Sequence, residues 1–264
     1  MRLSITHKTQ YSYDAPVDYA LQQVRLTPAT TRQQTVREWN VQVDGGKAEL
    51  THNDQYNNHI LLVSIEPGSD MVTLTASGEV ETLDSNGVLG HVYGYAPLWH
   101  FLQPSELTRP GKAVRALARL VSNDDVLSSL HNLSSEIARA VTYTTGQTYA
   151  ATDAEQALQG GHGVCQDHAQ IFISASRSAG VPARYVSGYL MMNDRIDQDA
   201  THAWAEAHID GLGWVGFDVS NGISPDERYV RVATGRDYRD AAPVSGMRMG
   251  SANESMIVSV QVQQ

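Results

Sequence analysis

The sequence predicts an α+β fold, in which a strand-rich N-terminal part precedes a core of helices packed on an antiparallel sheet. Three observations predict it. Short runs over residues 1–83 alternate apolar with polar side chains and are separated by turn residues, as in an antiparallel β-sandwich. Apolar residues then recur at helical spacing over residues 114–141. Alternating runs return over residues 184–220, where Asp210-Gly211 predicts a hairpin.

These elements divide the chain into three expected parts: a β-sandwich domain over residues 1–83, a connector over 84–110 and a core over 111–264. The connector is rich in Gly and Pro and contains one short helical turn over residues 98–102, in which we expect Trp99 to pack. In the core, Thr152 and Glu155 have the spacing of a capping box that starts a short helix. A final strand over residues 256–262 ends the core.

The composition is that of a globular protein, and it excludes several classes of function. The formal net charge is −10 at pH 7, with 19 Lys and Arg against 29 Asp and Glu, so we expect no nucleic-acid partner. No apolar run approaches the length of a membrane span, and residues 1–7 alternate like a strand and lack the apolar core of a signal peptide. We therefore expect a cytoplasmic location without membrane contact. The single cysteine excludes an intrachain disulfide and a Cys-rich zinc site.

The cysteine stands where thiol chemistry is favoured. Gly160, Gly161 and Gly163 form a loop before Cys165, and residues 164–179 contain neither Gly nor Pro, which predicts a buried helix with the cysteine in its first turn. The free N–H groups and the dipole at a helix start favour the thiolate, which is the nucleophilic form. The glycine backbone lets a carbonyl approach the sulfur, with N–H groups near its oxyanion. We predict a nucleophile; the alternative is a buried thiol that only fills the core.

A nucleophilic thiol needs a base, and the predicted hairpin offers one. His202 opens a row with Trp204, Glu206 and His208 on one face of the first strand. Asp218 lies between apolar residues on the second strand, where a carboxylate is costly to bury without a partner such as a histidine N–H. We predict that Asp218 orients His202, the general base and acid. The alternative is a structural, hydrogen-bonded aspartate.

The register of this hairpin conflicts with the predicted pair. With a two-residue loop, His202 faces Asn221, so Asp218 lies about 10 Å away along the strand and on the opposite face. We therefore expect a bulge or a slanted crossing over residues 210–213.

Three further residues are weaker candidates for the site. Gln147 and Tyr149 lie in the polar loop over residues 143–149, from which an amide or a phenol would donate to the oxyanion. Trp204 is a candidate wall of the acyl site. We also expect the polar segment over residues 192–200 to gate the cleft.

Neither a metal nor a cofactor is expected. His162, Cys165 and His168 lie three residues apart, a spacing that suits a Cys/His₂ zinc site. However, His162 precedes the helix across a glycine, and no second cysteine is left as a ligand. The glycines are not followed by the Lys-Ser/Thr pair of a phosphate loop.

Four segments, taken together, resemble one known family. They are Gly163-Val164-Cys165-Gln166-Asp167-His168-Ala169, residues 179–189, His202-Ala203-Trp204-Ala205-Glu206 and residues 213–218. These segments and the order Cys, His, Asp resemble the bacterial transglutaminase-like superfamily of candidate cysteine proteases. Residues 231–238 look like its usual downstream segment, and the first third is similar to the β-rich domain that often precedes the catalytic core. The resemblance covers nearly the whole chain.

The resemblance implies a papain-like α+β core with Cys165 as nucleophile, His202 as general base and acid, and Asp218 as orienting carboxylate. The resemblance says little about the substrate, and we expect a peptide or protein amide from the chemistry of the thiol. Two positions depart from the family pattern. His168 stands where an aromatic residue is common, which bears on the surroundings of the thiol, and Val219-Ser220 stands where Pro-Thr is frequent.

The expected function is therefore cleavage of amide or peptide bonds through a thioester, by a cysteine protease or amidase with a Cys-His-Asp triad. Two alternatives stay open, because the family includes proteases, amidases, transglutaminases and members without catalysis. One is a protein-glutamine transglutaminase, and the other is a non-catalytic peptide-binding module. No sequence feature identifies a second pocket for an amine, which favours hydrolysis.

Overall fold

The computed structural model describes residues 1–264 except 16, 18, 66–67, 92–94 and 250–252. The long strands are β1 (Arg2–Tyr13), β2 (Tyr19–Thr27), β3 (Gln34–Asp44), β4 (Gly46–Asn53), β5 (His59–Ile65), β6 (Met71–Thr82), β10 (Ala183–Leu190), β12 (His202–Ile209), β13 (Gly213–Phe217), β14 (Tyr229–Gly235), β15 (Val244–Met249) and β16 (Glu254–Gln263). The short strands are β7 (Val88–Gly90), β8 (Thr142–Tyr143), β9 (His162–Gly163) and β11 (Asp197–Gln198). The helices are η1 (Leu98–Leu102), α1 (Lys112–Ala118), α2 (Val126–Ala140), α3 (Ala154–Gly160), α4 (Cys165–Ser178) and α5 (Tyr238–Ala241).

Two antiparallel sheets are built mostly from the first third of the chain. One has the strand order β11-β16-β1-β6-β3, and the other has the order β15-β2-β5-β4. Every second residue of β1 is buried, because alternate side chains of a strand face the same way. Both sheets contribute to one cluster of buried side chains, which includes Tyr11 and Leu74 from the first sheet and Val24 and Val63 from the second.

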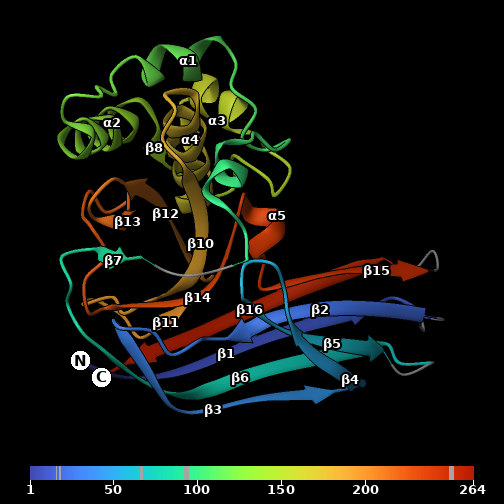
Figure 1. Cartoon of the computed structure of the whole chain (residues 1–264). Helices are drawn as coiled ribbons and strands as arrows, with labels where there is room; N and C mark the ends of the chain where they lie inside the picture. Colours follow the sequence, from blue (N-terminus) through green and yellow to red (C-terminus); the bar gives the residue numbers. More distant parts are fainter. Residues whose placement is uncertain (16, 18, 66–67, 92–94, 250–252) are drawn as a thin grey trace.

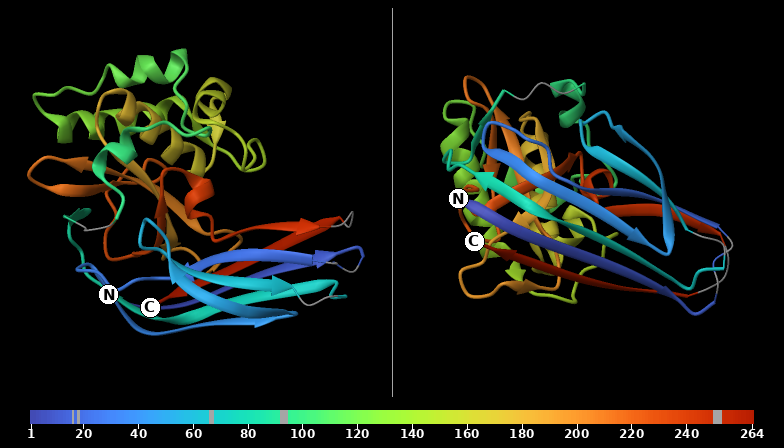
Figure 2. Two further views of the ribbon diagram at one scale, coloured as in Figure 1. Left: turned by 45° about the vertical axis from the view of Figure 1, so that its right-hand side comes forward. Right: turned by 90° about the horizontal axis from the view of Figure 1, so that it is seen from below.

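The last two strands belong to these sheets and not to the core, contrary to our expectation. β16 pairs with β1, from Ser4 opposite Gln263 to Tyr13 opposite Glu254, and β15 pairs with β2. Figure 2 shows β1 and β16 side by side, with the two ends of the chain close together. The sequence pattern identifies a strand over residues 256–262, but alternation alone does not say which sheet a strand joins.

The core is a third antiparallel sheet, of order β14-β10-β12-β13-β7, with helices α1 to α4 above it in Figure 1. α4 packs on this sheet, and Phe172 of α4 stacks on Phe217 of β13 with 4.9 Å between the ring centroids. Three alanines of β12 (Ala203, Ala205, Ala207) belong to the same buried cluster, and such small side chains let a helix approach a strand closely. Strands β10 and β14 join the N-terminal part through a second buried cluster that includes Leu3 and Tyr189.

The connector forms the predicted helical turn as η1, but its packing differs from the prediction. Phe101 is the buried residue of η1, whereas Trp99 is 62% exposed. The expectation that Trp99 packs at the junction is therefore wrong.

The predicted capping box is displaced by one residue. Asp153, not Thr152, caps α3: its carboxylate accepts from the N–H of Gln156 (2.8 Å), whose side chain accepts from the N–H of Asp153 (3.1 Å). The carboxylate of Glu155 instead accepts from backbone N–H groups at the start of α1. Glu155 thereby ties α3 to α1.

The β12–β13 hairpin resolves the register conflict in a way the sequence does not predict. Its loop has three residues rather than two, because Ile209 pairs with Gly213 and the ladder continues without a shift in register. Continued along the strands, this register keeps His202 and Asp218 on one face as diagonal neighbours, within reach of each other's side chains. The ladder itself contains no bulge, and the shift that we expected over residues 210–213 comes instead from one extra residue in the loop.

Among the described residues, no helix is both long enough and apolar enough to cross a membrane. The cytoplasmic location stays a prediction from the sequence.

Candidate active site

Cys165 is the first residue of α4 and is 7% exposed, at the wall of a cavity of about 340 Å³. α3 ends at Gly161, whose positive φ of 68° turns the chain back toward α4. Strands β8 and β9 then pair in parallel, with Tyr143 opposite Gly163. This short pair fixes the loop that delivers the cysteine to the helix start.

Asp167 closes the first turn of α4. Its Oδ2 accepts a hydrogen bond from the backbone N–H of Val164 (2.8 Å) and another from the hydroxyl of Thr148 (2.7 Å). A Cβ at Gly163 would lie 2.7 Å from the Cβ of Asp167, so only glycine fits at this position without movement of the carboxylate. The carboxylate takes the N–H that precedes the helix, which leaves the next N–H groups of the first turn for a substrate.

The histidine and the aspartate are in direct contact. His202 Nε2 lies 2.6 Å from Asp218 Oδ2, although the two residues come from different strands. The same oxygen accepts from the amide of Asn221 (2.7 Å) and the hydroxyl of Tyr229 (2.7 Å). Because Nε2 is engaged by Asp218, Nδ1 is the ring nitrogen left to hydrogen-bond the Cys165 thiol, an interaction that also acts on the pKa of His202. The structure thus brings the three predicted catalytic residues together in a row.

The electrostatics of this row favour a charged imidazole. Burial alone would lower the pKa of His202, but hydrogen bonds with Asp218 and Cys165 and the negative charge of both groups raise it to about 10. Burial opposes ionisation of Asp218 as well, yet the hydrogen bond and charge of His202, together with the donors from Asn221 and Tyr229, lower the pKa of Asp218. At neutral pH the pair is therefore an imidazolium beside a carboxylate, and an imidazolium stabilises a neighbouring thiolate.

Tyr143 is a site residue that the sequence did not indicate. It lines the same cavity and hydrogen-bonds Cys165. Burial, followed by the charges of Cys165 and Asp218, raises the pKa of Tyr143 to about 12, so its hydroxyl keeps its proton and can donate. The loop over residues 143–149 is the one we singled out, but the residue within it is different.

The three weaker candidates lie elsewhere. Gln147 is exposed, Tyr149 is 79% exposed, and neither lines the cavity of Cys165. Trp204 is 3% exposed and stacks on the ring of His202 at 6.2 Å, so it supports the base from behind and does not face the cavity. The sequence correctly places Trp204 on the same strand and the same face as His202. It does not show which residues of that face line the cavity of Cys165.

His168 takes part in packing next to the nucleophile. Its Nδ1 lies 2.8 Å from the hydroxyl of Ser220, and its Nε2 lies 3.0 Å from the carbonyl oxygen of Val141. Both ring nitrogens are therefore engaged, and burial lowers the pKa of His168.

Within the described ranges, no group of three His, Cys, Asp or Glu residues has the geometry of a metal site.

The N-terminal sheets supply part of the cavity wall, which no pattern in the sequence indicates. Thr9 and Tyr11 from β1 and Met256 and Val258 from β16 line it together with Cys165. These residues alternate as ordinary strand residues do. Their position at the site depends on how the sheets pack on the core, and local pattern carries no information on that packing.

Fold and site together define a class of α+β proteins in which a thiol at a helix start lies beside a histidine–aspartate pair on an antiparallel sheet. The sequence matches two families: the transglutaminase-like superfamily over residues 115–219, and the bacterial transglutaminase-like N-terminal region over residues 3–81. An uncharacterized protein of Mycobacterium bovis is 30% identical over 295 residues, which span 99% of this chain and 92% of that protein. An uncharacterized protein of Mycobacterium leprae is 27% identical over 275 residues, 99% of this chain and 98% of the relative.

One solved structure is similar over the whole chain. It is a candidate cysteine protease from Cytophaga hutchinsonii, with a TM-score of 0.78 at 22% identity, and it covers 100% of this chain and 91% of its own. At that identity the likeness establishes a shared fold. The chain belongs to the transglutaminase-like superfamily.

Proposed function

We propose that the protein is a thiol-dependent hydrolase that cleaves amide or peptide bonds through an acyl-thioester on Cys165. The observation that carries the proposal is the hydrogen-bonded row of Cys165, His202 and Asp218, in which Cys165 lies at the wall of a cavity of about 340 Å³. The candidate cysteine protease from Cytophaga hutchinsonii, which shares the fold, supports the same reaction class.

The proposed reaction has two steps, formation of a thioester on Cys165 and its hydrolysis by water. The thiolate of Cys165 attacks the carbonyl carbon, and the N–H groups at the start of α4 stabilise the oxyanion. His202 then donates its proton to the departing amine as the C–N bond breaks, which leaves a thioester and a neutral imidazole. A water molecule gives its proton to His202 and attacks the thioester, and the C–S bond breaks to give the carboxylic acid and the thiolate. Asp218 keeps the imidazole oriented throughout.

The cavity is suited to an acyl group with an apolar side chain. Its wall combines Tyr143 at the thiol with Tyr11, Val258 and Met256 from the N-terminal sheets. The proposed substrate is a peptide or protein amide. Hydrolysis is proposed over transfer to an amine because water needs no pocket of its own.

Selective alkylation tests the state of Cys165. Iodoacetamide at pH 6 should label the wild-type protein rapidly, because an imidazolium at His202 next to the sulfur makes Cys165 a better nucleophile. The variant His202→Ala should react at least about tenfold more slowly, since it loses that charge. His162→Ala is a matched control, because His162 is an exposed histidine three residues before Cys165 and its nearest hydrogen-bond partner is Thr144. Equal and slow labelling of all three proteins would contradict the proposal and favour a peptide-binding module.

A second measurement separates hydrolysis from transfer. Ammonia release from a glutamine peptide is followed with and without a primary amine, alongside mass analysis of the peptide. Conversion of glutamine to glutamate in both cases supports hydrolysis. Incorporation of the amine in place of water would show a transglutaminase instead.

A further inference from the structure

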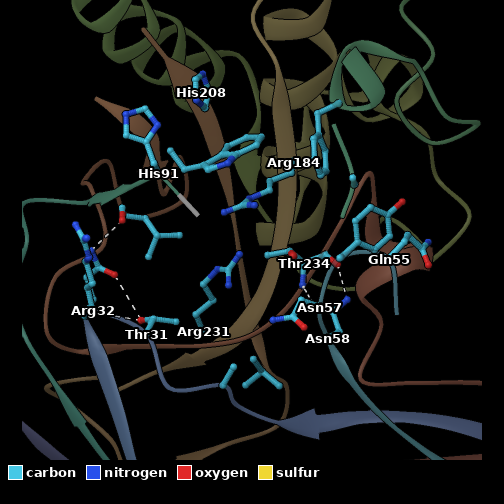
Figure 3. Close-up of a pocket in the computed structure, with 18 of the residues that line it drawn as sticks. Thr31, Arg32, Gln55, Asn57, Asn58, His91, Arg184, His208, Arg231 and Thr234 are labelled. Atoms are coloured by element: carbon cyan, nitrogen blue, oxygen red, sulfur yellow. Dashed lines mark hydrogen bonds between the residues drawn. The ribbon is translucent and has the colours of Figure 1, made fainter. Parts of the chain in front are cut away.

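A second cavity, of about 460 Å³, lies apart from the catalytic cavity. Its wall combines the N-terminal part with β10, β12, β13 and β14, and it shares no lining residue with the cavity of Cys165. Figure 3 shows this cavity, with Arg184 and Arg231 directed toward its centre and His91 and His208 above them. Neither the catalytic row nor the proposed reaction uses these groups.

Arg184 is a buried arginine in the wall of this cavity, and one of its guanidinium nitrogens has no hydrogen-bond partner in the part of the chain that the structure describes. The residue is 6% exposed, its guanidinium lies 3.9 Å from the ring centroid of Trp214, and its Nε donates to Glu206 at 2.6 Å. Its Nη2 is buried and has no hydrogen-bond partner among the described residues. A buried guanidinium N–H without a partner is costly, so a ligand that accepts from it would be bound favourably.

Arg231 supplies a second guanidinium to the same cavity. Its Nε donates to the other oxygen of Glu206 at 3.1 Å, and its side chain is 17% exposed. Glu206 therefore holds both arginines by their Nε atoms, one on each carboxylate oxygen. The guanidinium end of Arg231 faces the cavity, and the buried, unpartnered Nη2 of Arg184 becomes available to an acceptor once the wall shifts slightly. A carboxylate fits two such forks.

The charge in the cavity matches a single negative charge. Two arginines against Glu206 leave a net charge of +1, and burial lowers the pKa of the neighbouring His208 imidazole and so favours its neutral form. Arg32, which also lines the cavity, is exposed. The charge of a dianion such as phosphate would exceed that of the buried pair.

The other lining residues indicate what the uncharged part of the ligand is like. Phe101, Trp214, Leu89 and Pro97 give the cavity an apolar side next to the arginines. Asn58 does not compete for the anion, because its side chain is already paired with the backbone of Thr234 through two hydrogen bonds of 2.7 and 2.8 Å.

We propose that this cavity is a binding site for a small organic monocarboxylate with an apolar or aromatic body. The carboxylate accepts hydrogen bonds from Arg184 and Arg231, and the apolar body lies against Trp214 and Phe101. The site is separate from the catalytic row: Glu206 lies four residues along β12 from His202, which is about 13 Å at the usual rise of a strand.

Calorimetry with benzoate tests the proposal on the full chain. Benzoate should bind with a Kd of about 1 mM or tighter, whereas benzamide, which has the same shape without the charge, should not bind measurably. Inorganic phosphate should not displace benzoate. Equal binding of benzamide, or displacement by phosphate at equal concentration, would overturn the assignment.

Two variants locate the binding. Arg231→Gln removes one fork and should weaken benzoate at least about tenfold. Arg184→Lys keeps the charge but loses the fork geometry and should weaken it similarly. Arg139→Gln, on an exposed part of α2, is the control and should bind as the wild type does. Circular dichroism checks folding, and if the Arg184 variant fails to fold, the more exposed Arg231 carries the test.

Two further measurements make the outcome specific to this cavity. Cys165→Ala should bind benzoate as the wild type does, so the result does not depend on the proposed catalysis. In crystals soaked with 4-iodobenzoate, the iodine should appear near Trp214. Iodine at Cys165 alone, or unchanged binding by Arg231→Gln, would show that the cavity is not the site.

Discussion

Asp218 is the residue through which the surroundings control the base. One of its oxygens contacts His202, Asn221 and Tyr229, and the residue is 1% exposed. Because these donors stabilise the carboxylate, Asp218 remains charged and keeps the pKa of His202 high. Three hydrogen bonds to one oxygen also fix the plane of the carboxylate, and with it the plane of the imidazole.

We therefore expect Asp218→Asn to lower kcat/KM by about 10²-fold or more, because the imidazole loses both its orienting partner and the charge that favours its proton. The sign of the pH effect follows from the raised pKa. His202 is protonated below its pKa of about 10, so loss of a group that raises this pKa moves the alkaline limb of the activity profile to lower pH. The measurement is kcat/KM from pH 5 to 10 on an amide substrate identified by the glutamine-peptide assay. An unchanged alkaline limb would mean that Asp218 has only a structural role.

For single residues, the chemistry of the side chain decides whether a site residue can be predicted from the sequence. A lone cysteine after glycines and a carboxylate between apolar neighbours are each costly or reactive, so Cys165, His202 and Asp218 stand out, and the structure places them together. Gln147 and Tyr149 are polar residues in a polar loop, and Tyr143 in the same loop carries no stronger signal than they do. Only the pairing of β8 with β9 brings Tyr143 to the thiol. The catalytic roles themselves stay proposals.

Among the elements, α4 depends on the loop that precedes it. A methyl group at position 163 would contact the Cβ and the carboxylate of Asp167, which lie 2.7 and 2.8 Å from the position of the added atom. The carboxylate would have to move and lose its hydrogen bonds with Val164 and Thr148. The cost falls on the helix start that holds Cys165.

Gly163→Ala is expected to lower the free energy of unfolding by about 1–3 kcal/mol and to slow iodoacetamide labelling. Gly160→Ala is the matched control, because a Cβ at Gly160, the last residue of α3, meets nothing within 4 Å. That control should be neutral or slightly stabilising. Urea unfolding and labelling rates measure both effects. Similar stability and labelling in the two variants would show that the close approach of Gly163 to Asp167 has no role.

Elements were easier to predict than their connections. Alternation and helical spacing identify strands and helices, since both patterns are local. The capping box was assigned one residue too early because Thr152 and Asp153 are both good N-caps, and the carboxylate of Glu155 is engaged at α1. The hairpin loop was assigned one residue too short because Asp-Gly also suits a two-residue loop. For the capping box, the contact of Glu155 with α1 separates two good local choices.

The wall of the catalytic cavity is shared between the core and the N-terminal sheets. Met256 lines this cavity from β16 and is 56% exposed, so it is accessible to a ligand in the cavity and contributes little to the core. Its replacement should therefore act on substrate binding more than on stability.

For Met256→Glu we expect KM for a peptide amide to rise about threefold or more with kcat nearly unchanged, because the new charge lies where an apolar acyl group would bind. Labelling by the small iodoacetamide should not change. Met247→Glu is the control, since Met247 is a similarly exposed methionine on β15 that lies outside this cavity. Equal KM values for the two variants would show that the N-terminal sheets take no part in substrate binding.

The pairing of β16 with β1 also has a consequence for how the protein is made. β1 is synthesised early, but its partner over residues 254–263 is synthesised only after the cysteine, the histidine and the aspartate. Until then one edge of β1 lacks its neighbour, and the substrate pocket lacks the wall that Met256 and Val258 provide. A nascent chain that already carries its cysteine therefore acquires this part of the cavity wall only when the late strand docks, after residue 263 has been synthesised.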